Sequence, residues 1–161
     1  MSIYNKKNFV ADFAYRTKKN LDFINKNKNT HKIFETTQMI NSFLGLIIFP
    51  QERSIFNKIS CDPVFLSKLI HCIKKNTYEG EIDFSKILRH LRNSIAHGKI
   101  EINSLEEEDK HFEINNLIFK DKNPKNESEE FIIDISIDDL KILVNIILTE
   151  IEEKQKNRIN I

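Results

Sequence analysis

The segment LRHLRNSIAHGK, Leu88–Lys99, places an amphipathic helix directly before a histidine and a glycine. At about 100° per residue, the apolar side chains of this helix fall within roughly 60° of one another. They are Phe84, Leu88, Leu91 and Ile95, and Ile87 broadens the stripe. Asn93 and His97 fall on the opposite side, whereas Arg92 lies on the flank. A histidine of the helical core would share the apolar stripe, so we expect the His97 ring to point outward.

Two interpretations of His97 remain open. Gly98 suits the residue that follows a helix, so His97 could simply cap the helix by bonding a free carbonyl. Alternatively, histidine is the side chain whose ordinary pKa suits a general base near neutral pH. Arg92, five residues earlier, has the planar guanidinium that matches phosphate oxygens. Together they suit metal-independent cleavage of RNA, in which a base removes the 2′-hydroxyl proton beside a charged phosphate.

One histidine and one arginine are too few for the whole reaction, because general-base catalysis contributes typically about 10²–10⁴-fold. A second copy of the chain would add an acid and another cation. We therefore expect a homodimer in which two copies of the motif act together. Arg89 shares the outward side of the helix and is a candidate for binding RNA, as is Lys99.

The rest of the chain predicts a mainly α fold. Helical periodicity marks the ranges 8–26, 32–53, 62–75, 83–97 and 137–157, and Asp62, Asp83 and Ser136 are candidate N-caps. Alternating apolar residues mark strands at 99–103, 111–119 and 130–136. We predict one domain over residues 1–161, a helical bundle with a small antiparallel β meander inserted at about 99–136, before the last helix. The polar tail at about 154–161 is expected to fray.

The helix predicted at 32–53 is apolar nearly all round except for one narrow stripe. Gln38, Asn41, Ser42 and Gly45 follow each other at helical spacing. Either these small and polar residues permit a close helix contact, or Gln38 and Asn41 line a functional site.

The first 100 residues and the rest of the chain have opposite charge, although the net charge is only +1. Residues 1–100 hold 17 Lys and Arg against 8 Asp and Glu, whereas residues 101–161 hold 8 against 16. Such asymmetry suggests that one region meets an anion such as nucleic acid. Cys61 and Cys72 form no CxxC motif and are expected to be ordinary core or surface residues.

The sequence contains no motif typical of membrane-spanning, secreted, phosphate-loop or zinc-dependent proteins. No apolar run is long enough to span a membrane and no secretory signal opens the chain, so we expect a cytoplasmic protein. The three glycines form no phosphate-binding loop, and no HExxH motif is present. We predict neither a metal nor a cofactor.

The motif Arg92-Asn93-Ser94-Ile95-Ala96-His97 has the form R-x4-H with a polar residue after the arginine. It resembles the signature of the HEPN superfamily, and FETTQMINSFLGLIIFPQE, residues 34–52, resembles the second helix of a defence-associated HEPN branch. The resemblance implies a dimeric, metal-independent endoribonuclease with Arg92 and His97 as catalytic residues and Asn93 in support. It also implies products with a 2′,3′-cyclic phosphate and a 5′-hydroxyl. HEPN toxins paired with nucleotidyltransferase antitoxins often have tyrosine two positions after the histidine, where this chain has Lys99.

Three functions follow as hypotheses. The first is a ribonuclease of a toxin or antiviral defence system that acts on tRNA or mRNA. The alternative is a non-catalytic HEPN module that binds RNA, a nucleotide or a protein. The third is a structural dimer component whose charged face meets an antitoxin or another regulatory protein.

Overall fold

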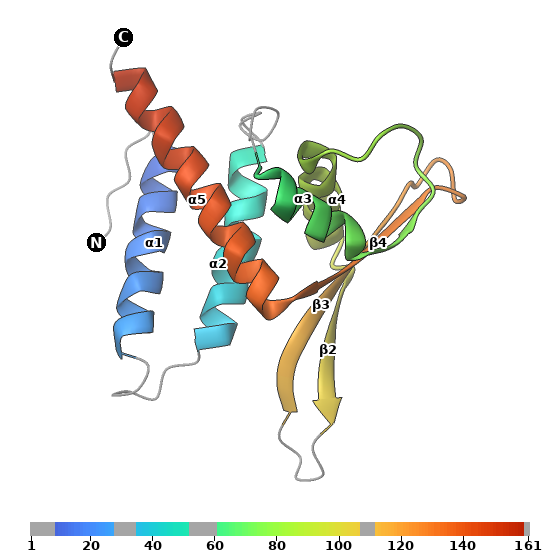
Figure 1. The fold of residues 1–161 in the computed structure, drawn as a ribbon, viewed down its shortest axis with the longest axis horizontal. Helices are drawn as coiled ribbons and strands as arrows, with labels where there is room; N and C mark the ends of the chain where they lie inside the picture. Colours follow the sequence, from blue (N-terminus) through green and yellow to red (C-terminus); the bar gives the residue numbers. More distant parts are fainter. Residues whose placement is uncertain (1–8, 28–34, 52–60, 107–111, 160–161) are drawn as a thin grey trace. The chain divides into compact units, whose positions relative to one another are not determined.

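The computed structural model describes residues 9–27, 35–51, 61–106 and 112–159 (Figure 1). These residues are mainly helical and include a small antiparallel sheet, as the sequence predicted. The chain divides into two compact units, residues 1–55 with 141–161 and residues 56–140. We call them the helical unit and the sheet unit. A single bundle that contains every helix, and a single domain over 1–161, stay predictions.

The helical unit contains α1 (Phe9–Asn27), α2 (Glu35–Gln51) and most of α5 (Ile137–Ile159). Their apolar stripes are buried: Val10, Ala14, Met39, Phe43, Leu46, Ile47, Leu143, Val144, Ile147, Leu148 and Ile151. Lys18 of α1 pairs with Glu152 of α5, with 2.9 Å between Nζ and Oε1. The predicted tail at 154–161 begins within α5, whose helix extends to Ile159.

Gly45 permits a close contact between α1 and α2. A Cβ atom at this position would lie 2.9 Å from Cζ of Phe13, closer than packed carbon atoms approach. Ser42 beside it is buried, whereas Asn41 is exposed. The helix-contact interpretation of this stripe is therefore confirmed for Gly45. Gln38 and Asn41 lie on α2, and their part in lining a site stays a prediction.

The sheet unit contains α3 (Pro63–His71), β1 (Ile73–Asn76), α4 (Phe84–Ala96), β2 (Ile100–Glu106), β3 (Phe112–Lys122) and β4 (Glu130–Ser136). Its strands are ordered β1-β4-β3-β2, and each neighbouring pair is antiparallel. Side chains of β4 alternate as a half-buried strand requires, with Phe131, Ile133 and Ile135 on the buried face. Helix α4 packs against β3, so the helix with the motif rests on the sheet.

Strand β1 corrects the predicted helix at 62–75. Helix α3 ends at His71, and Ile73–Asn76 pairs with β4 instead. Ile73 lies opposite Ile133, and the backbone N–H of Asp134 donates to the carbonyl of Cys72 at 3.0 Å. The edge of β4 supplies partners for this backbone, so long-range pairing outweighs the local helical pattern.

The three predicted helix caps are confirmed. The Asp62 carboxylate accepts from the backbone N–H groups of Val64 and Phe65, and Asp83 accepts from Lys86 at 2.7 Å. Ser136 Oγ accepts from the backbone N–H of Asp139 at 3.1 Å, which starts α5 directly after β4. These caps satisfy N–H groups that lack partners within their helices.

Candidate functional site

Helix α4 presents its apolar side to the core as the sequence predicted. Phe84, Ile87, Leu88 and Leu91 are all buried, and Ile95 is half-buried. The sheet buries a further part of the helix, since Ser94 and His90 have almost no exposed surface. Only part of the polar side of α4 therefore remains open to solvent.

The backbone itself caps the end of α4. Gly98 has a φ of +64°, in the left-handed region that favours glycine. Its N–H donates to the carbonyl of Ile95, and the N–H of Lys99 donates to that of Ser94 at 2.8 Å. This pair of bonds is the Schellman arrangement of a helix C-terminus. The carbonyls of Asn93, Ser94 and Ile95 thus accept from backbone N–H groups at this helix end.

The His97 ring does not cap the helix within the described structure. His97 is exposed, and within the described ranges its ring makes no hydrogen bond or ion pair. His71 at the end of α3 shows the contrast, because its Nδ1 lies 2.7 Å from the carbonyl oxygen of Ser67. The predicted outward orientation of His97 agrees with its exposure.

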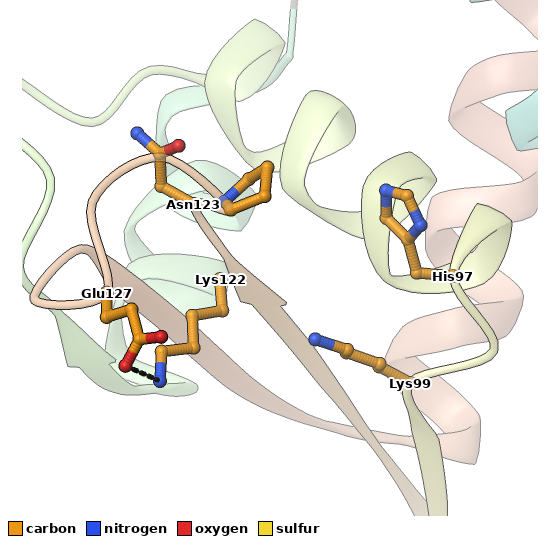
Figure 2. A pocket seen from close by; sticks show the side chains of 6 residues that line it. His97, Lys99, Lys122, Asn123 and Glu127 are labelled. Carbon is orange, nitrogen blue, oxygen red and sulfur yellow. Dashed lines mark ion pairs between the residues drawn. The ribbon is translucent and has the colours of Figure 1, made fainter.

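An open pocket of about 310 Å³ lies beside His97. It is lined by His97, Lys99, Lys122, Asn123, Pro124 and Glu127. Figure 2 shows His97 at the end of α4, Lys99 at the start of β2 and the other residues around the β3–β4 turn. Lys122 and Glu127 pair at 3.8 Å, and both are largely exposed. Two lysines beside an imidazole give the pocket the donors that a phosphate group needs.

The sequence identified His97 and Lys99 but missed the pocket residues of the β3–β4 turn. The run Lys122–Glu127, KNPKNE, has the composition of an ordinary turn. The pairing of β2 with β3, in which Lys120 donates to the carbonyl of Lys99, brings this turn beside the end of α4. No local pattern could have indicated it.

Arg92 and Asn93 lie one turn before the pocket and do not line it. Arg92 is half-buried, and its Nη1 donates to Oδ1 of Asn93 at 3.2 Å. Nδ2 of Asn93 donates to Oδ2 of Asp121 on β3 at 3.0 Å. The Asn93 side chain therefore bonds Arg92 and Asp121. Arg89 is exposed and also lies outside the pocket lining.

His90 is a second functional candidate that the sequence interpretation passed over. It is only 1% exposed, and its Nδ1 lies 2.8 Å from Oδ2 of Asp121. Its ring stacks on Phe131 with centroids 4.3 Å apart and meets Tyr78 at 4.6 Å. Burial lowers the pKa of His90 below its ordinary value, although the nearby Asp121 opposes that shift. The ring is therefore neutral near physiological pH.

The described segments contain no cluster of three or more His, Cys, Asp or Glu side chains able to hold a metal ion. Cys61 and Cys72 are half-buried free thiols, and burial raises the pKa of each. Among the helices for which the structure gives coordinates, none has the length and apolar character needed to cross a membrane.

Comparison with known proteins identifies the family. The family model described as HEPN pEK499 p136 matches residues 1–158, nearly the whole chain. No curated protein and no solved structure matches the chain. The match includes the R-x4-H segment and both compact units. The chain therefore belongs to the HEPN pEK499 p136 family, within the HEPN superfamily that its motif resembles.

Proposed function

We propose that this protein is a metal-independent endoribonuclease that cleaves RNA with His97 and Arg92. The observation that carries the proposal is the His97 ring, exposed and without a ring partner in the described structure, in a pocket with Lys99 and Lys122. Membership of the HEPN superfamily, which includes many ribonucleases, supports the same chemistry.

In the proposed reaction, neutral His97 removes the proton of a ribose 2′-hydroxyl. The 2′-oxygen attacks the adjacent phosphorus, the bond from phosphorus to the 5′-oxygen breaks, and an acid protonates the leaving oxygen. The products are a 2′,3′-cyclic phosphate and a 5′-hydroxyl. Arg92 stabilises the negative charge that develops on the phosphate oxygens, a role for which its fork of donors is suited.

The leaving oxygen requires an acid, and His97 is the one histidine in the lining of the described pocket. We propose a homodimer, in which His97 of the partner subunit supplies that proton. Lys99, Lys122 and the exposed Arg89 attract the RNA backbone, so binding weakens as salt increases. We place the enzyme in a toxin or antiviral defence system, with tRNA or mRNA as the substrate class.

The test is cleavage of defined tRNAs and mRNAs by the purified protein in EDTA, with its oligomeric size measured in parallel. We expect wild-type protein to form cyclic-phosphate products as a dimer, and His97→Ala and Arg92→Ala to form them at least about a hundredfold more slowly. Full cleavage by folded His97→Ala protein would overturn the proposal. RNA binding without any product would favour the non-catalytic HEPN module, because the lysines of the pocket bind phosphate without chemistry.

A further inference from the structure

A chain of hydrogen bonds leads from a buried carboxylate of the sheet to the half-buried motif arginine. Asp121 on β3 is 5% exposed, and its Oδ2 accepts from Asn93 at 3.0 Å and lies 2.8 Å from Nδ1 of His90. Asn93 in turn accepts from Arg92 at 3.2 Å. One carboxylate oxygen of Asp121 on β3 therefore connects this strand with two residues of α4, His90 and Asn93.

This chain fixes the orientation of the Asn93 amide. A carboxylate only accepts hydrogen bonds, so the Asn93 NH₂ group must face Asp121. The amide oxygen then faces away from Asp121, toward Nη1 of Arg92. A guanidinium only donates, so Arg92 favours the same orientation of the amide. Asp121 therefore anchors the NH₂ end of the amide in the orientation that holds Arg92.

His90 holds Asp121 in place. The ring is fixed between Tyr78 and Phe131, and in its neutral form Nδ1–H donates to the carboxylate. Its Nε2 is buried and has no partner within the described residues. An unpartnered buried nitrogen is unfavourable, and a phenylalanine here would avoid it. The feature that histidine adds is the Nδ1 donor to Asp121.

We propose that Asp121, held by His90, is a positioning residue for RNA cleavage that acts through Asn93 on the Arg92 guanidinium. This inference rests on the proposed ribonuclease function. Asp121 lies outside the R-x4-H motif, on a strand of the sheet. The sheet therefore contributes to the arrangement of the motif as well as to the pocket beside His97.

The test is a double-mutant cycle on the full-length protein, with cleavage of one RNA as the measurement. We expect Asp121→Ala to lower kcat about 10–100-fold with KM changed less than about threefold, because small displacements of a positioned group have effects of this size. Asn93→Ala should lower kcat similarly. If Asp121 acts through Asn93, adding Asp121→Ala to Asn93→Ala should lower kcat less than about twofold further.

Asp134→Ala is the matched control. Asp134 on β4 also accepts from an asparagine amide across the sheet, 2.7 Å from Nδ2 of Asn116, but takes no part in the chain to Arg92. The substitution Asp134→Ala should therefore leave kcat unchanged. Should Asp121→Ala fail to fold, Asp121→Asn has nearly the same shape and enters the same cycle.

Each outcome decides the inference. A kcat loss that disappears in the Asn93→Ala background supports positioning. Additive losses, or full activity of Asp121→Ala in an active preparation, overturn it while the proposed function stands. Wild-type protein that cleaves none of the RNAs overturns the proposed function and this inference together.

Discussion

His90 lies in α4 and His97 is the residue that follows its last turn; seven residues apart, they lie within about 20° of each other around the helix axis. Their environments are opposite. His90 is 1% exposed and fixed by Asp121, Phe131 and Tyr78, whereas His97 is exposed beside an open pocket. The same side of one helix therefore carries a buried ring and an open ring.

The sheet produces this difference. Residues of β3 and β4 cover α4 at His90, and two turns later the helix ends and Gly98 turns the chain into β2. A buried neutral ring can supply a fixed hydrogen bond but has no contact with substrate. An exposed ring can exchange a proton with it. Under the proposed function, proton transfer therefore falls to His97 and support of the site to His90.

The largest effect is expected from removing the open ring. His97→Ala should lower RNA cleavage by about 10²–10⁴-fold, the range that a general base contributes. The free energy of unfolding should change by less than about 0.5 kcal/mol, since the side chain is exposed. Initial cleavage rates and urea unfolding measure the two quantities.

His71→Ala is the control for this substitution. His71 is also an exposed histidine at a helix end, but it bonds the carbonyl of Ser67. We expect unchanged cleavage and a small loss of stability. Equal cleavage by the His71→Ala and His97→Ala proteins would remove the functional distinction between these rings.

Removing the buried ring should lower stability far more than removing the open ring does. His90→Ala leaves a cavity between Phe131 and Tyr78 and deprives Asp121 of a donor, so we expect a loss of about 3 kcal/mol in unfolding free energy. Urea unfolding with an unchanged m value would measure it. A loss below about 1 kcal/mol would show that the ring does not hold this part of the core.

Much of α4 could be predicted from the sequence. The period of Phe84, Leu88 and Leu91 indicated the buried side, and Gly98 indicated the helix end. These features depend on residues close together in the chain, so a helical wheel drawn from the sequence shows them. The outward His97 and the cap at Asp83 followed from the same local information.

The surroundings of His90 could not be predicted in this way. Asp121 and Phe131 belong to strands 31 and more residues away, and only the register of β3 with β4 places them over the helix. Strand β1 was missed for the same reason, because its partner is β4. A wheel shows which side of α4 is polar, but it does not show where the sheet covers that side.

The buried His90 should also make the free energy of unfolding depend on pH. The pKa of His90 is lowered in the folded protein, chiefly by burial, from an ordinary value of 6.5. Below pH 6.5 the unfolded chain binds a proton that the folded chain excludes, so stability should fall as the pH drops through this region. The slope from one such group is at most about 1.4 kcal/mol per pH unit.

His90→Gln tests this assignment, because an amide can donate to Asp121 but does not titrate near neutral pH. Urea unfolding between pH 5 and pH 8 should show a flatter dependence than the wild-type protein. An unchanged slope in His90→Gln protein would assign the dependence to another group.

The smallest expected effect concerns Gly98, the glycine between His97 and Lys99. Gly98 has a φ of +64°, and nothing within 4 Å would obstruct a Cβ atom there. Gly98→Ala should therefore lower stability by about 1 kcal/mol through backbone strain alone. Gly98→Asn should lower it less, because asparagine tolerates this conformation better. Thermal unfolding of both variants measures the difference, and equal losses would point to a cause other than the left-handed backbone. Cleavage should follow the same order, because the turn at Gly98 places His97 and Lys99 on the same pocket.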